Sequence, residues 1–229
     1  MCGAATFLTQ DNLQVLISDF RIADFRVSHD LSPSYNLRPM QSALISRIDK
    51  GQRTLETAQW WLLPHFEPEP KTKLTTFNAR DDRLMQGMFR PYFQKHRALF
   101  LVDSYFEWKK EGSARVPFRF TVDAGKHFAL AGLYSLWRSP NGSDERLTCS
   151  VVTTDANDLG KPIHSRMPVI LDPSVHDEWL DPHCADARTL LPLLRPFPSD
   201  RMVKCQVSSA VNSACHNLPD CIQPVAVWL

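Results

Sequence analysis

The sequence predicts an α+β fold: a single domain whose curved, mainly antiparallel β-sheet closes toward a barrel, with short helices at its periphery. Two observations predict this fold. Many short apolar runs alternate with polar turns, whereas few segments have the residue spacing of a helix. The 229 residues are 43% hydrophobic and show no break in composition, so they can build one sizeable core. We therefore expect one domain over residues 2–229.

The first third of the chain indicates a helix and then a hairpin. Residues 12–25 place on one helical face the apolar side chains Leu13, Leu16, Ile17 and Phe20. SPSYNLRP (32–39) is expected to be extended because its two prolines block a helix. SALISRI (42–48) and TLETAQWWLLP (54–64) are typical of strands joined by a turn at DKGQR. Residues 64–76 hold three prolines and mixed charge, which favours a surface loop.

The rest of the chain is predicted to be mainly strands. RLMQGMFRPYFQKH (83–96) indicates a helix broken near Pro91. Strands joined by polar turns such as SPNGSDE are then expected at residues 97–108, 116–123, 127–137 and 146–155. Short helices at 174–180 and 186–194 precede closing strands at 202–208 and 221–229.

Composition excludes some classes of protein. With 26 Lys and Arg against 25 Asp and Glu, the total charge gives no evidence for a nucleic-acid partner, and a local basic groove is compatible with it. No window approaches the roughly 18 consecutive apolar residues of a membrane span. The N-terminus lacks the basic region and apolar run of a secretory signal. We therefore expect an intracellular, cytoplasmic protein.

The six cysteines form no CxxC pair, and we expect reduced thiols. A zinc site from Cys205, Cys215, His216 and Cys221 can be imagined, but the spacing matches no standard ligand pattern. Buried or incidental cysteines are the better interpretation. We expect neither a metal nor an organic cofactor.

Cys2 directly follows the initiator methionine. We expect removal of Met1 because residue 2 is small. Cys2 then carries a thiol and a free α-amine two bonds apart, a β-aminothiol. An α-amine with a pKa near about 8 is partly unprotonated at neutral pH, so it can act as a nucleophile without extreme activation.

Two further residues are candidates for proton transfer. Glu107 lies among aromatic residues in SYFEWKK, where loss of solvent would raise its pKa. Its alternative is an exposed strand glutamate that pairs with Lys109. His164, in KPIHSRMPVIL, is a candidate general acid or base, and its alternative is a structural histidine.

Two other segments are candidates for ligand binding. Asn78 and Arg80 in FNAR could bind an oxyanion, a sugar or a phosphate, although NAR is a common tripeptide. Phe66 and the nearby Trp60 and Trp61 could stack on unpaired bases. The tryptophans fit a protein core equally well.

One ordered combination of motifs makes these weak signals specific: Cys2-Gly3, SYNLRP, WWLLP, NAR, YFEWKK, IHSRMPVIL and VSSAVN. In this order they resemble the SOS-response-associated peptidase (SRAP) family, the abasic-site processing proteins. The resemblance runs from residue 2 to about residue 225. It implies a protein of the DNA damage response that finds abasic sites in single-stranded DNA. It also implies a covalent thiazolidine crosslink between the N-terminal cysteine and the ring-opened sugar.

The resemblance implies a role for each matching residue. Glu107 would transfer protons during imine formation and reversal, and Asn78 would position the sugar and the N-terminus. His164 would help to open the sugar ring or stabilise the intermediate. The implied DNA contacts are Arg80, Arg166, Thr153 and Phe66. We expect single-stranded DNA with abasic sites as the partner, no membrane, a monomer, and association with the nucleoid when DNA is bound.

The chain departs from the family pattern in places. Ala4 replaces the usual arginine, Met40 a common glycine, Asp82 the usual glutamate, and Ser165 a frequent acidic residue. The lost arginine predicts weaker DNA binding, because each lost phosphate contact lowers affinity and flattens its salt dependence. Two other functions stay open: a thiol peptidase that uses Cys2, and a damaged-DNA binding module without lasting chemistry.

Overall fold

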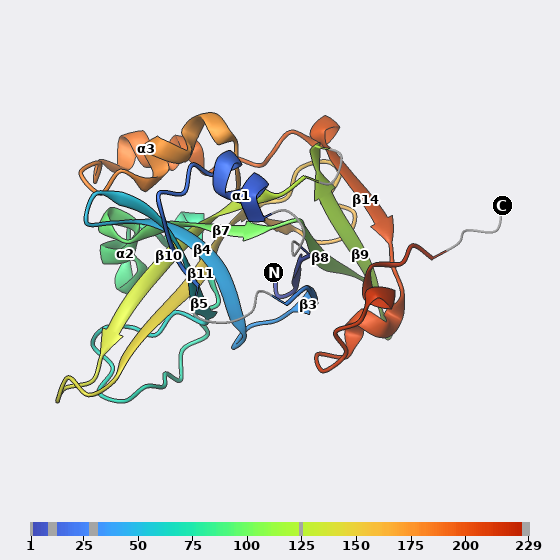
Figure 1. Cartoon of the computed structure of the whole chain (residues 1–229). Coiled ribbons are helices and arrows are strands. Elements are labelled where there is room, and N and C mark those ends of the chain that lie inside the picture. The colour runs from blue at the N-terminus through green and yellow to red at the C-terminus, as the bar shows by residue number, and fades with distance from the viewer. Residues whose placement is uncertain (1, 9–12, 28–31, 124–125, 226–229) are drawn as a thin grey trace.

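A computed structural model describes residues 2–8, 13–27, 32–123 and 126–225 (Figure 1). Five strands form a closed ring, in which each pairs with the next and the last returns to the first. In ring order they are β4 (Ser42–Asp49), β5 (Gln52–Trp60), β11 (Glu145–Asp155), β10 (Phe128–Arg138) and β7 (Arg97–Val102). Four contacts of the ring are antiparallel, and β5 with β11 is parallel. The predicted curved, barrel-like α+β fold is confirmed.

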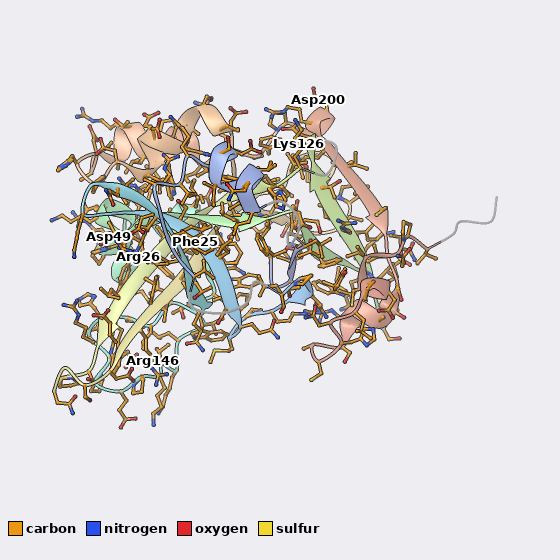
Figure 2. All side chains as sticks on the ribbon, in the orientation of Figure 1. Phe25, Arg26, Asp49, Lys126, Arg146 and Asp200 are labelled. Atoms are coloured by element: carbon orange, nitrogen blue, oxygen red, sulfur yellow. The ribbon has the colours of Figure 1, made fainter. Side chains whose placement is uncertain are left out.

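Short strands extend this ring at its edges: β2 (Asp24–Arg26), β6 (Asn78–Arg80), β12 (Arg166–Pro168) and β13 (Ile170–Leu171). β2 runs parallel to β5. Arg26 of β2 forms an ion pair with Asp49 at the end of β4, with 2.6 Å between nitrogen and oxygen, and both residues are labelled in Figure 2. β6 lies parallel to β11, and β12 lies antiparallel to it. The candidate site is built partly on β6 and β12.

A second sheet packs beside the ring and is antiparallel throughout. Its strands, in order, are β14 (Met202–Gln206), β9 (Ala114–Val122), β8 (Ser104–Glu111), β1 (Ala5–Phe7) and β3 (Ser34–Leu37). In Figure 1 this sheet lies on the side of the molecule opposite the long β10–β11 hairpin.

Alternation along the strands divides the core into two main clusters, because successive side chains of a strand point to opposite faces. On β7, Phe100 belongs to the cluster between the ring and the second sheet, whereas Leu99 and Leu101 belong to the other. Short helices cover that other cluster: α1 (Leu13–Asp19), α2 (Arg90–Lys95), α3 (His176–Leu180) and α4 (Ala187–Leu190). No helix among the described residues is long and apolar enough to cross a membrane.

Single turns of 3₁₀ helix complete the described structure: η1 (Asp81–Arg83), η2 (Gly87–Phe89), η4 (Pro173–Val175), η5 (Leu191–Leu193), η6 (Ser199–Arg201), η7 (Ser209–Asn212) and η8 (Pro219–Ile222). The predicted loop at 64–76 and the strands at 42–48, 54–60, 116–123, 127–137, 146–155 and 202–206 are confirmed.

Three predicted boundaries near the N-terminal half are wrong. Helix α1 ends at Asp19 because Arg21 takes a positive φ of 50° and the Ile22 amide bonds to the Ile17 carbonyl, which closes the helix. The second helix begins at Arg90 and does not break at Pro91, since proline fits the first turn, where its missing N–H costs nothing. The single strand predicted over 97–108 is two strands in different sheets.

Asp103 separates these two strands. Its buried carboxylate accepts hydrogen bonds from the Thr6 hydroxyl and, at 2.6 Å, from the Leu8 amide. These bonds attach β1 to the turn where the chain passes from the ring to the second sheet.

The closing strand predicted at 221–229 is also wrong over its described part. Residues 219–222 form η8, and beyond it only an isolated bridge joins Pro224 to Val207 within the described chain. Residues 226–229 lie outside the described residues.

Candidate active site around Cys2

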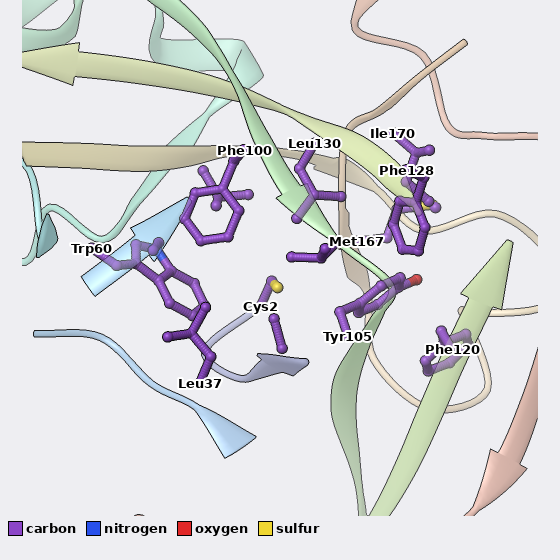
Figure 3. Packing of buried hydrophobic residues seen from close by; sticks show 14 of the residues in the cluster. Cys2, Leu37, Trp60, Phe100, Tyr105, Phe120, Phe128, Leu130, Met167 and Ile170 are labelled. Carbon is purple, nitrogen blue, oxygen red and sulfur yellow. The ribbon is translucent and has the colours of Figure 1, made fainter. Parts of the chain in front are cut away.

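Cys2 is fully buried between the ring and the second sheet. Figure 3 shows its thiol at the centre of an apolar group, with Leu37, Trp60, Met167 and Tyr105 around it. Burial raises the pKa of the thiol well above its ordinary range, and the negative charge of Glu107 raises it further. The thiol therefore stays protonated at neutral pH.

Strand pairing brings the start of the chain beside Glu107. β1 and β8 are antiparallel, with Ala5 opposite Tyr105, and the Phe106 amide donates to the Ala4 carbonyl at 3.0 Å. The same register, extended toward the N-terminus, places the residues before Ala5 alongside Glu107. The buried carboxyl and the Cys2 thiol therefore lie close enough to influence each other's charge.

Glu107 is buried, with 3% of its surface exposed. Burial raises its pKa from 4.5 to about 7, so at neutral pH it populates both the acid and the carboxylate. Lys109 forms its ion pair with Glu111, at 2.6 Å, and not with Glu107. The alternative of an exposed glutamate paired with Lys109 is therefore wrong.

Asn78 is tied directly to the first described residue. Its Nδ2 donates a 2.8 Å hydrogen bond to the carbonyl oxygen of Cys2. β6 holds Asn78 in place because it pairs with β11, with Asn78 opposite Val151. A rigid strand thereby fixes the position of the Cys2 main chain.

His164 lies in the connection between β11 and β12. Its Nδ1 is 3.0 Å from the Arg166 amide, which donates to it. The same Nδ1 lies 3.2 Å from the Arg166 carbonyl oxygen, to which it donates in the other tautomer. Partial burial lowers the pKa of His164, so the neutral ring prevails at pH 7.

The two arginines predicted to bind DNA contact aspartates in this structure. Arg166 donates to the Asp81 and Asp155 carboxylates at 2.6 and 2.9 Å, and to the Thr153 carbonyl. Arg80 forms two bonds to Asp82, at 2.9 and 2.6 Å. A phosphate that reaches either guanidinium has to compete with these carboxylates.

Three of the predicted residues carry buried polar atoms that make no hydrogen bond within the described chain. They are Asn78 Oδ1, Thr153 Oγ1 and Arg166 Nε. Thr153 lies on β11, opposite Arg80 of β6 and Pro168 of β12. Buried polar groups in folded proteins are normally paired, so these atoms are suited to bind a ligand.

Phe66 lies apart from this group, on the 61–77 connection. Its side chain is exposed, at 57%, and its ring packs edge-on against His65. His65 in turn bonds to the Tyr92 hydroxyl of α2 at 2.9 Å. Trp60 is fully buried and donates to the Phe77 carbonyl at 2.9 Å, so it is a core residue and not a stacking surface.

Sequence reasoning gave no role to Arg38 and Trp108, although both lie in quoted motifs. Arg38 lies 5.0 Å from the centre of the Trp108 ring and donates to the Gly3 carbonyl at 3.5 Å. Arg115 lies near the same ring, at 5.6 Å. With Asn212 these residues line a cavity of about 150 Å³. The second sheet brings them together, because β3 precedes Arg38, β8 carries Trp108 and β9 carries Arg115.

The position of the missing arginine is also visible. Ala4 is fully buried in a small cluster with Phe106, Val207, Val211 and Cys221. An arginine here would have to displace the C-terminal segment that covers it. The predicted weakening of DNA binding stays a prediction, and Ala4→Arg would not test it cleanly in this chain.

The family model described as SOS response associated peptidase (SRAP) matches residues 1–214. The chain belongs to the SRAP family. It is 35% identical over 225 residues to the abasic site processing protein YoqW of Bacillus subtilis, covering 97% of this chain and 99% of that protein. Similarity extends to the abasic site processing protein HMCES of Gallus gallus, 29% identical, over 84% of this chain and 66% of that protein.

The fold of this SRAP chain also matches a solved structure. A crystal structure of a protein from Bacteroides thetaiotaomicron superposes with a TM-score of 0.78 and covers 96% of this chain and 92% of that chain. Its sequence is 24% identical, so it supports the fold alone.

Proposed function

We propose that this chain processes abasic sites in single-stranded DNA by forming a covalent crosslink through Cys2. The arrangement of side chains around Cys2, the first described residue, supports this proposal most directly. Asn78 holds the Cys2 carbonyl at 2.8 Å, and the buried Glu107 has a pKa of about 7. The names of the family relatives agree with this substrate.

The reaction requires prior removal of Met1, which frees the α-amine of Cys2. The amine attacks C1′ of the ring-opened abasic sugar, and loss of water gives an imine. The thiol sulfur then adds to the imine carbon, and the thiol proton ends on the nitrogen. The net change is aldehyde plus aminothiol to thiazolidine plus one water, without an oxidant or a metal.

Glu107 is suited to move the protons of this sequence. Its acid form can protonate the departing hydroxyl, and its carboxylate can then accept the thiol proton and deliver it to nitrogen. A group with a pKa near the working pH populates both forms. Reversal uses the same steps in the opposite order.

Asn78 and His164 serve as positioning groups in this proposal. Asn78 fixes the Cys2 main chain, and its unpaired Oδ1 is available to a sugar hydroxyl or to the amine. Neutral His164 would donate a ring N–H to the sugar ring oxygen and thereby assist ring opening.

For the DNA strand we propose contacts with Arg80, Arg166 and Thr153, which lie on β6, β12 and β11. Arg80 is exposed, and Arg166 and Thr153 carry donors without a hydrogen-bond partner in the described chain. Phe66, exposed on its loop, would stack on a more distant base. We further propose that the protein acts as an intracellular monomer and that residues 2–229 form one domain.

A thiol peptidase is less consistent with this site. A peptidase nucleophile needs a thiolate, which nearby positive charge stabilises. Burial and Glu107 here raise the pKa of the Cys2 thiol instead. The first nucleophile is therefore better assigned to the amine than to the sulfur.

Intact mass spectrometry tests the proposal. The intact mass of the purified protein is measured before and after incubation with a single-stranded oligonucleotide that contains one abasic site. We expect a mass without Met1, and then an adduct that forms without borohydride and survives denaturation. Cys2→Ala should give no adduct, and Cys215→Ser, which changes an exposed cysteine, should react as wild type.

Two results would contradict the proposal. If the protein without Met1 forms no adduct, a non-covalent binding module is favoured. Protection of abasic DNA by the Cys2→Ala variant would then support that function. An adduct that persists after the α-amine is blocked would favour thiol chemistry alone.

A further inference from the structure

His216, Asp220 and Cys221 form a compact cluster in the C-terminal segment. One potential ligand atom from each lies within 4.8 Å of the other two. His216 Nε2 is 2.7 and 2.9 Å from the two carboxylate oxygens of Asp220. The Cys221 thiol lies 3.5 Å from the His216 carbonyl oxygen. An imidazole, a carboxylate and a thiol thus converge on one point.

We propose that His216, Asp220 and Cys221 bind one Zn²⁺ ion. Zinc accepts nitrogen, oxygen and sulfur ligands in a tetrahedral arrangement. A thiolate disfavours Mg²⁺ and Ca²⁺, and a carboxylate disfavours Cu⁺, so this mixed set selects zinc among the common ions. Three protein ligands leave the fourth position to a water molecule.

Binding requires a small local change. Zinc–ligand bonds of about 2.0–2.3 Å bring the ligand atoms closer together than they are here. The Cys221 sulfur has to rotate away from the His216 carbonyl toward the imidazole. The thiol releases its proton to solvent, and His216 binds as the neutral ring.

The local fold presents the three groups with different exposure. η8 carries Asp220 and Cys221, and the His216 amide bonds to the Ser213 carbonyl at 3.1 Å, which folds the preceding turn back. Asp220 and His216 are at least partly exposed, and they give an ion access from solvent. Cys221 is fully buried, where a thiolate needs a compensating cation.

The sequence spacing alone suggested a different set of ligands. Cys215 is exposed and lies outside the cluster. The Asp220 carboxylate supplies a ligand where the sequence spacing had offered a cysteine thiol. Cys215 is therefore a matched control, because it is adjacent to His216 in sequence and is not a ligand in this proposal.

Zinc would fasten the C-terminal segment to the second sheet. Asn36 of β3 donates to the carbonyls of Val211, Ser213 and His216. The Asn217 side chain accepts from the amides of Tyr35 and Asn36, at 2.6 and 2.9 Å. An ion at the cluster would hold the turn that makes these bonds, so it should raise the melting temperature.

The test is a titration of chelator-treated full-length protein with Zn²⁺, followed by calorimetry, and with Co²⁺, followed by absorbance. We expect one ion per chain, a thiolate-to-cobalt charge-transfer band and a higher melting temperature with zinc. Removing a residue that only hydrogen-bonds to a metal ligand lowers metal affinity by about 10–100-fold. Removing a ligand itself, as in Cys221→Ser or His216→Gln, should therefore lower zinc affinity by roughly 100-fold or more. Cys215→Ser should bind as wild type.

Cys2→Ala is the second control, because the amine and thiol of Cys2 could chelate zinc themselves. It should keep the site. The proposal is overturned if no stoichiometric ion binds, or if binding survives both Cys221→Ser and His216→Gln. Loss of binding in Cys2→Ala or Cys215→Ser would also overturn it. Crosslinking to abasic DNA can be assayed in the presence of a chelator, without zinc. The zinc proposal and the proposed function can therefore fail independently of each other.

Discussion

Asn78 donates a 2.8 Å hydrogen bond to the carbonyl oxygen of Cys2, across 76 positions of sequence. This bond joins β6, at the edge of the ring, to the residues that precede β1 of the second sheet. The position of the candidate nucleophile thus depends on the packing of the two sheets.

Asn78→Ala should slow crosslinking by roughly fivefold, because loss of about 1 kcal/mol of hydrogen bonding leaves the Cys2 carbonyl unpaired and the amine less well placed. Gel-based adduct formation over time measures this rate. Asn141→Ala, which changes an exposed turn of the β10–β11 hairpin, is the control and should react at the wild-type rate. Equal rates in both variants would remove Asn78 from the site.

Glu107→Gln should slow both formation and reversal of the crosslink by on the order of 10²-fold, because the amide cannot transfer protons. The wild-type rate should change with pH around 7, where Glu107 titrates, and the variant should lose that inflection. Rates measured from pH 5.5 to 8.5 test both statements. An unchanged profile in the variant would assign the proton transfer to another group.

The same carboxyl predicts a pH dependence of stability. Its folded pKa, about 7, lies above the unfolded value of 4.5, so the native state binds more protons between these two values. Its contribution is most favourable below pH 4.5 and is lost as the pH rises through 7. Glu107→Gln should therefore gain on the order of 2–3 kcal/mol relative to wild type between pH 4.5 and pH 8. Urea unfolding at both pH values measures the difference, which is absent if Glu107 titrates normally.

Met40 stands in a turn where the family commonly has glycine, and its φ is 75°. This left-handed conformation is unfavourable for a residue with a Cβ atom. Met40→Gly should therefore stabilise the protein by roughly 1 kcal/mol. Met40→Ala keeps the Cβ atom and is the matched control. Thermal unfolding decides the matter, and an equal effect of both substitutions would trace it to the exposed methionine side chain instead.

Asp81 contacts Arg166 at 2.6 Å, so under the proposed function it would compete with DNA for that guanidinium. Asp81→Asn should tighten binding to single-stranded DNA about threefold and steepen its salt dependence, since one competing carboxylate is removed. Anisotropy titrations at several salt concentrations measure both effects. Asp186→Asn, which frees the exposed Arg188 instead, should leave the affinity near wild type. Weaker binding of Asp81→Asn would mean that Asp81 serves to hold Arg166 in its binding position.

The sequence by itself determined the strand pattern, the curved antiparallel sheet and the family. Alternation of apolar residues along strands such as 128–138 is a local property, and it survives in the structure. The ordered motifs from Cys2 to VSSAVN identified the family, and the family model matches residues 1–214. The candidate site residues were also named from sequence, and the roles of those residues stay predictions.

Tertiary structure decided what local patterns do not carry. The register of β1 on β8 buries Glu107, and that burial moves its pKa to about 7, although the sequence equally allowed an exposed glutamate. The contact between Asp81 and Arg166 forms only through the β6–β11–β12 pairing. The split at Asp103 depends on β1 bonding to its carboxylate. Each of these depends on contacts between residues far apart in sequence, which a single chain read in order does not specify.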